Sequence, residues 1–178
     1  MSDLLTRLKI VEEHVRQENA HDLDGIMTTF GPWARYEDES WRERHEGQEK
    51  VRRYYEDLLR ALPDLAIEVK EEYVAGDRVI QEVVIRGTHE GFWRGLPGTG
   101  KRLEFPLCSV YAFDHENRIS AERIYYDRAT VMAQLGLLHD PLSLQGKIVN
   151  ALTHPLTMLG SVLHTCLKVV SKKGKQVF

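Results

Sequence analysis

Residues 78–90 read RVIQEVVIRGTHE, and two similar runs follow, LEFPLCSVYAF at 103–113 and ISAERIYYD at 119–127. In each run, β-branched, aromatic or other apolar side chains alternate with polar ones, which is typical of β-strands. A short turn precedes the first run, and a glycine-rich connection at 91–100 follows it. With a further strand expected at 66–74, these runs predict an antiparallel meander.

The chain before this meander has the spacing of helices. Apolar residues recur every three or four positions from Leu4 to Val15, and Asp22 is a good cap for a second, short helix. A third helix is expected from Gly47 to Leu62, and a weak alternation between Trp33 and Trp41 predicts a strand. Helices followed by a meander indicate an α+β domain in which a curved antiparallel sheet is wrapped around N-terminal helices.

The last part of the chain is a separate element. Leucines and other apolar residues spaced by threes and fours over 142–170 predict a pair of helices, the second starting at Pro155. Residues 141–178 contain five lysines and no Asp, Glu or Arg. We therefore expect a core domain at 1–139 and a basic helical C-terminal extension at 140–178.

Composition excludes several classes of protein. The 178 residues include 24 Lys and Arg against 27 Asp and Glu, and the first 140 residues carry a net charge of −8, which argues against nucleic acid as a partner. The N-terminal sequence does not resemble a signal peptide, and two cysteines are too few for a disulfide framework, so a cytoplasmic location is expected.

The eight histidines share no short ligand spacing, and no phosphate loop or dinucleotide fingerprint is found. We expect neither a metal nor a cofactor.

Alternation predicts which side chains point inward. Along the strand at 78–90, Val83, Ile85 and His89 share the apolar face, so His89 is expected in the interior. Along the strand at 119–127 neither face is plainly apolar. Either Arg123, Tyr125 and Asp127 point inward, or Glu122, Ile124 and Tyr126 do.

The first alternative would suit proton-transfer chemistry. A carboxylate in an apolar pocket has a raised pKa, which would make Asp127 a general acid or base. His89 could orient a substrate carbonyl, and Tyr125 or Tyr36 could donate a hydrogen bond to a developing enolate. The alternative is structural, with Asp127 capping a strand end beside Arg123 or Arg128 and His89 a hydrogen-bonded core residue.

Several short motifs, in order, resemble those of the SnoaL-like polyketide cyclases. They are NAHDLD at 19–24, GQE at 47–49, LPD at 62–64, GTHEG at 87–91, GLPGTGK at 95–101 and AQLG at 133–136, the last following the final strand. This resemblance covers residues 4–138. It implies a cone-shaped α+β barrel, in which the curved sheet encloses a ligand cavity behind the N-terminal helices.

The resemblance also implies an activity and a site. In these cyclases an aspartate ending the last long strand is the acid and base of a cofactor-independent intramolecular aldol closure. By this resemblance Asp127 and His89 would be catalytic, and Arg123 and Tyr125 would line the cavity. The side chains of Tyr36, Trp41, Phe92 and Trp93 are also expected to bind substrate.

The sequence departs from the family pattern at two of these positions. Arg123 and Tyr125 stand where a His and a Trp are usual, and an arginine beside the acid would lower its pKa, which favours a base or a site for an anionic ligand.

The expected function is therefore cyclisation or isomerisation of a small apolar carbonyl compound by a homodimeric enzyme. Two alternatives are a non-catalytic module that binds a hydrophobic ligand, and a hydrolase or dehydratase on the same cone. For the extension, the alternatives are core packing or a dimer contact, a lid, and adsorption to an anionic membrane surface.

Overall fold

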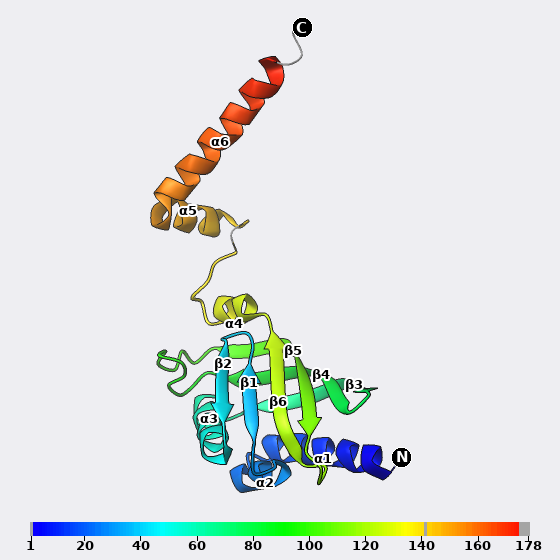
Figure 1. Cartoon of the computed structure of the whole chain (residues 1–178). Helices are drawn as coiled ribbons and strands as arrows, with labels where there is room; N and C mark the ends of the chain where they lie inside the picture. Colours follow the sequence, from blue (N-terminus) through cyan, green and yellow to red (C-terminus); the bar gives the residue numbers. More distant parts are fainter. Residues whose placement is uncertain (1, 141, 175–178) are drawn as a thin grey trace. The chain divides into compact units, whose positions relative to one another are not determined.

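The computed structural model describes residues 2–140 and 142–174. They form two compact units that divide between Leu135 and Gly136. The first unit consists of helices packed on a curved sheet (Figure 1). Its elements are α1 (Ser2–Asn19), α2 (Leu23–Thr29), β1 (Arg35–Asp38), β2 (Glu43–Glu46), α3 (Gln48–Ala61), β3 (Ala66–Ala75), β4 (Arg78–Thr88), β5 (Arg102–Phe113), β6 (Ile119–Tyr126) and α4 (Arg128–Gln134). The expected α+β class is confirmed.

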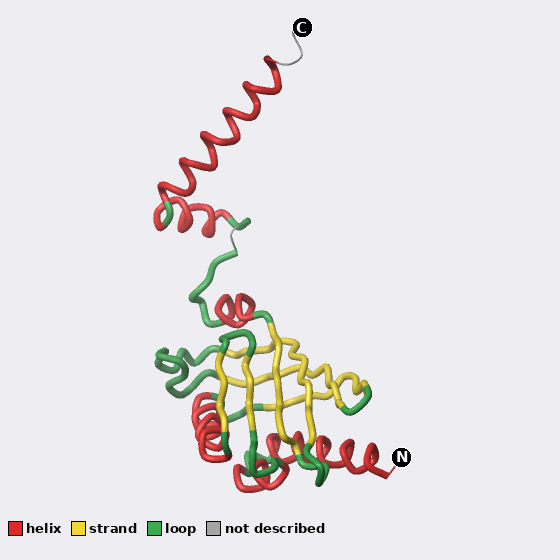
Figure 2. The backbone as a smooth tube through the Cα atoms, viewed as in Figure 1, coloured by secondary structure: helices red, strands yellow, loops and turns green. Residues whose placement is uncertain are grey.

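The six strands form one sheet in the order β2-β1-β6-β5-β4-β3. Figure 2 shows the strands of this sheet in yellow. Strands β3 to β6 are the predicted antiparallel meander, with Val79 paired to Tyr111 and Thr88 paired to Arg102 across β4 and β5. Strand β1 adds in parallel to β6, and β2 pairs antiparallel with β1 at the sheet edge. The expected strand at 33–41 is therefore only four residues long, and β2 was not predicted, because its ERHE sequence carries no apolar alternation.

Local sequence explains how the helices begin. The Asp22 carboxylate caps α2 by accepting a hydrogen bond from the Gly25 amide, at 2.9 Å. Gly47, with a φ of 87°, lets the chain turn from β2 directly into α3. Helix α3 then buries Val51, Tyr54 and Tyr55 against the sheet.

The core lies between the helices and the inner face of the sheet. Val11, Ile26 and Tyr55 from the three helices pack with Tyr111 of β5 and Ile124 of β6. A second cluster around Leu62, Val83 and Phe105 fills the other end of the sheet. These contacts bring α1 and α3 over the strands that carry the polar interior residues described below.

The inner face of β6 corrects one expectation. Glu122 and Ile124 are buried, whereas Tyr125 is 44% exposed and the Arg123 side chain is 42% exposed. The inward-facing set is therefore Glu122, Ile124 and Tyr126, and the expectation that Arg123, Tyr125 and Asp127 line the cavity is wrong. Arg123 is held outside by the buried Glu37 carboxylate, to which its Nε donates at 2.5 Å.

The second unit contains α5 (Leu144–Thr153) and α6 (Pro155–Gly174), and α6 starts at the predicted proline. The Ser143 hydroxyl caps α5 by accepting from the Gly146 amide at 2.9 Å. Many apolar side chains of this unit are exposed, among them Leu142, Leu144, Leu152, Leu156 and Leu163. None of the helices in the described residues has the length and hydropathy to cross a membrane.

Candidate functional site

The cone contains a small cavity of about 50 Å³, which we call the inner cavity. Most of its wall is apolar and comes from α3 and from β3 to β6. Seven polar side chains also face it, namely Glu18, Tyr36, Tyr54, Ser109, Tyr111, Glu122 and Tyr126. An apolar cavity with a few converging polar groups is the common form of a small-molecule site, although such sites usually have volumes of about 300–1,000 Å³.

Two of these polar groups belong to a buried ionisable cluster, the acid–imidazole cluster, formed by His14 and Glu18 of α1, Tyr55 of α3 and Glu122 of β6. His14 Nε2 lies 3.3 Å from Glu122 Oε2 and 3.7 Å from Glu18 Oε1. The Tyr55 hydroxyl donates to Glu122 Oε2 at 2.8 Å. All four residues are at most 6% exposed.

Hydrogen-bond donors and acceptors assign the charge of His14. The Thr29 hydroxyl gives its hydrogen to the Ile26 carbonyl, so it accepts from His14 Nδ1 at 2.8 Å. The Tyr55 hydroxyl gives its hydrogen to Glu122, so its contact of 3.1 Å with His14 Nε2 makes that nitrogen a donor too. Both ring nitrogens then carry hydrogen, and His14 is an imidazolium.

The pKa shifts agree with this assignment. Burial alone would lower the pKa of His14, but the carboxylates of Glu18 and Glu122 outweigh it and the pKa is raised. Burial raises the pKa of Glu18 from its ordinary value of 4.5 to about 7, against the opposing attraction of His14. Glu18 therefore exchanges a proton near neutral pH, and it does so at the wall of the inner cavity.

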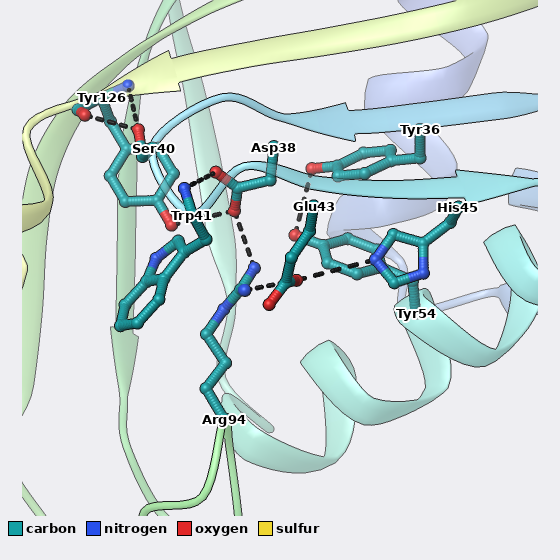
Figure 3. Close-up of polar contacts among 9 residues, drawn as sticks. All are labelled: Tyr36, Asp38, Ser40, Trp41, Glu43, His45, Tyr54, Arg94 and Tyr126. Carbon is teal, nitrogen blue, oxygen red and sulfur yellow. Dashed lines mark hydrogen bonds and ion pairs between the residues drawn. The ribbon is translucent and has the colours of Figure 1, made fainter.

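A second polar cluster surrounds the Asp38 carboxylate and joins residues of β1, β2, β6 and the 91–100 loop (Figure 3). The buried Asp38 carboxylate at the end of β1 accepts from Arg94 Nη2 at 2.7 Å and from the Tyr126 hydroxyl at 3.1 Å. Arg94 also pairs with Glu43, and its guanidinium lies over the rings of Trp41 and Trp93, 4.7 and 5.0 Å from their centroids. Burial raises the pKa of Asp38, while the charge of Arg94 acts in the opposite direction.

Arg94 reaches this position from a tight turn in the 91–100 loop. Trp93 and Leu96 exchange two backbone hydrogen bonds of 2.8 Å, and the two residues between them, Arg94 and Gly95, have φ angles of 50° and 83°. Two successive positive φ values define a type I′ turn, which glycine accepts freely and arginine does not. The ion pair with Asp38 holds Arg94 in this conformation.

The structure places Asp127 away from the inner cavity. Its side chain is exposed and caps α4, accepting from the Ala129 amide at 2.8 Å and from the Thr130 hydroxyl at 2.7 Å. These hydrogen bonds lower the pKa of Asp127, with Thr130 the largest cause. The geometry assumed for a catalytic Asp127 in an apolar pocket is therefore wrong, and the side chain lies on the outer face together with Tyr125.

His89 is buried, as predicted, but the structure does not bring it to Asp127. Its Nδ1 lies 3.2 Å from the Thr99 hydroxyl and its ring packs 6.2 Å from Trp93, while its Nε2 has no hydrogen-bond partner among the described residues. No hydrogen bond or ion pair joins His89 to Asp127 in the described part of the chain. His89 does not line the inner cavity.

The aromatic residues expected to bind substrate separate into two groups. Tyr36 and Trp93 line the inner cavity. Phe92 is 65% exposed and lines a separate outer hollow, and Trp41 packs against Trp93 at a centroid distance of 6.0 Å. Only Tyr36 and Trp93 would contact a ligand in the inner cavity.

Sequence reasoning missed the acid–imidazole cluster. His14 and Glu18 are four residues apart on the apolar side of α1, a spacing that places them on one helix face. Glu122 belongs to the second of the two faces considered for β6. Nothing in the sequence links positions 14 and 122. They come together only because β6 packs against the helix layer.

The same cluster has the composition of a metal site. Among the described residues, His14, Glu18 and Glu122 offer ligand atoms that all lie within 4.8 Å of one another. A metal would need a lone pair on a His14 nitrogen, however, and both nitrogens donate hydrogen bonds in the arrangement above. The residues fit an imidazolium between two acids better than they fit a metal ligand set.

Comparison with solved structures identifies the class of fold. AclR from Streptomyces galilaeus matches with a TM-score of 0.65 and 26% identity over 75% of this chain and 87% of its own. A SnoaL-like protein from Jannaschia sp. CCS1 gives a TM-score of 0.68 and 21% identity, over 74% of this chain and 92% of its own. SalBIII, an epoxide hydrolase/cyclase-like enzyme of pyran ring formation in salinomycin, gives a TM-score of 0.63 and 23% identity, over 73% of this chain and 97% of its own. The first unit is a cone of the nuclear transport factor and ketosteroid isomerase type.

The model of the SnoaL-like polyketide cyclase family matches residues 9–135, which is nearly all of this cone. The chain belongs to the SnoaL-like polyketide cyclase family. A search of curated proteins finds no match.

The Asp38–Arg94 pair generates a stability prediction. Arg94→Met leaves the buried Asp38 carboxylate without its cation, so we expect a loss of about 3–5 kcal/mol in the free energy of unfolding measured in urea. Asp38→Asn combined with Arg94→Met removes both charges, and its loss is expected to be smaller than the sum of the two single losses. Arg52→Met, which breaks only exposed ion pairs, is the control and is expected to cost about 0–1 kcal/mol. Strict additivity of the two single losses would contradict this account.

Glu18 generates a pH-dependent prediction. Its pKa of about 7 in the native state lies above its ordinary value of 4.5. Between pH 4.5 and 7 the native state therefore holds a proton on Glu18 that the unfolded state has lost, so the stability of the wild type falls as the pH rises through this range. Glu18→Gln mimics the neutral acid. We expect it to match wild type near pH 4.5 and to exceed it at pH 8 by about 1–3 kcal/mol, measured by urea unfolding at each pH.

The control for this experiment is Glu12→Gln, an exposed change on the same helix, for which no such trend is expected. A Glu18→Gln variant less stable than wild type at pH 8 would contradict the raised pKa.

Proposed function

We propose that the chain is a cofactor-independent acid–base enzyme that cyclises or isomerises a small carbonyl compound in the inner cavity. The observation that carries the proposal is the Glu18 carboxyl, which faces an apolar cavity and has a pKa of about 7. A general acid or base works best when its pKa lies near the working pH, because both protonation states are then populated. Family membership supports the same class of reaction.

Glu18 would move the proton. In its ionised form it takes a proton from the carbon next to a carbonyl, the resulting enolate carbon bonds to a second carbonyl carbon, and the new alkoxide takes the proton back from Glu18. The atoms balance without a further reactant. In an isomerisation the same proton returns to a different carbon.

The neighbours of Glu18 would position and tune it. His14 and Tyr55 both contact the Glu122 carboxylate, which fixes that part of the cluster, and the charge of His14 opposes the effect of burial on Glu18. Tyr36 is suited to stabilise the substrate oxygen. Its hydroxyl accepts from Tyr54 at 3.3 Å, and no acceptor for its own hydrogen is found among the described residues. That hydrogen is available to an enolate oxygen in the cavity.

Proton exchange on a simple ketone tests this proposal without the natural substrate. The chain is incubated with 2-tetralone in D₂O near pD 7, and loss of the α-proton signals is followed by NMR. We expect wild type to accelerate exchange over buffer, Glu18→Gln to lose that acceleration by about 10²-fold or more, and Tyr36→Phe to lose about 10-fold or more. Asp127→Asn, which keeps the α4 cap, is the matched control and is expected to equal wild type.

Circular dichroism and thermal unfolding establish that each variant is folded. Exchange no faster than in buffer with wild type, or an unchanged rate with Glu18→Gln, would contradict the proposal. Loss of exchange in Asp127→Asn would move the chemistry to the outer face.

A further inference from the structure

A second and larger hollow, the outer cleft, lies between α3, β2 and the 91–100 loop. Its volume is about 580 Å³, within the range of small-molecule sites. Tyr54 and Trp93 line both the outer cleft and the inner cavity, so these two side chains form the wall between them. A molecule held in the cleft would therefore contact two side chains that also line the inner cavity.

The cleft is positive although the domain is acidic. It is lined by four cations against two acids, in a stretch of 140 residues whose net charge is −8. Asp57 is paired with Arg60 at 2.8 Å, and Glu43 with Arg94. Lys50 and Arg53 form no ion pair within residues 2–140 and 142–174, so the cleft keeps two free cations.

These two cations share one face of α3. Lys50 and Arg53 are three residues apart, which places them about one turn from each other on the side that lines the cleft. Two neighbouring donors of this kind suit an anionic oxygen group such as a carboxylate, which accepts from several donors at once.

The rest of the cleft presents flat apolar surface. Phe92 is 65% exposed, and Trp93 and Tyr54 add ring surface next to it. A large aromatic side chain exposed beside two free cations favours a ligand with an apolar, planar body and a negative head. Arg94, whose side chain is only 8% exposed, also lines the cleft, and its Nε donates to nothing among the described residues.

We propose that the outer cleft binds a small aromatic carboxylate, with the carboxylate on Lys50 and Arg53 and the planar body against Phe92 and Trp93. This inference rests on the proposed function in one respect. It assigns an acidic group to the proposed substrate, whose carbonyl part would pass between Tyr54 and Trp93 into the inner cavity. Binding in the cleft itself does not depend on catalysis.

Calorimetric titration with 2-naphthoate tests this proposal on the full chain. We expect wild type to bind 2-naphthoate at least about tenfold more tightly than the neutral 2-naphthamide, and this difference to shrink as salt is added. Lys50→Met combined with Arg53→Met is expected to weaken 2-naphthoate binding about tenfold or more and to leave 2-naphthamide binding unchanged.

The matched control is Lys9→Met combined with Arg35→Met, which removes two exposed cations outside the cleft and is expected to bind as wild type. Absence of 2-naphthoate binding, equal affinity for the amide, or undiminished binding in the folded Lys50/Arg53 variant would each overturn the proposal. Glu18→Gln is expected to bind 2-naphthoate as wild type does, so a failure of the catalytic proposal is distinguishable from a failure of this one.

Discussion

The burial of two carboxylates beside one imidazolium is the constraint on which the interior of this cone depends. Burying a charge is costly unless a partner compensates it, and His14 compensates only one of the two acids. Glu122 accepts from Tyr55 and Ser109, whereas Glu18 has the pKa of about 7. The excess proton of the cluster therefore resides on Glu18, which like Glu122 faces the cavity, where proton transfer to a ligand is possible.

Tyr54 and Trp93, which line both hollows, connect the site of the proposed proton transfer to the outer cleft. The inner cavity, at about 50 Å³, has room for little more than water, so the cavity would have to widen to hold a carbonyl compound. Trp93 precedes the turn that Arg94 and Asp38 hold in place, and Gly95 at its centre has a φ of 83°. The buried ion pair thus also holds the turn next to Trp93, a side chain that lines both hollows.

The sequence predicted most of the fold because the helix and strand periods of α1, α3, β4 and β5 are strong. It predicted the buried position of His89 for the same reason, since Val83 and Ile85 define the inner face of β4. The β6 strand has no apolar face, so periodicity left its orientation open, and the family resemblance chose the wrong one. The acid–imidazole cluster joins residues more than 100 positions apart, and only the packed structure brings them together.

The protonation of the acid–imidazole cluster can be tested by measuring the apparent pKa of Glu18. It can be measured from the pH dependence of the side-chain carboxyl ¹³C shift of Glu18, assigned by its absence in Glu18→Gln. A midpoint near 7 is expected in the folded wild-type chain. A midpoint near 4.5, the ordinary value for a glutamate, would contradict the role proposed for Glu18, because its carboxyl would then be ionised at neutral pH.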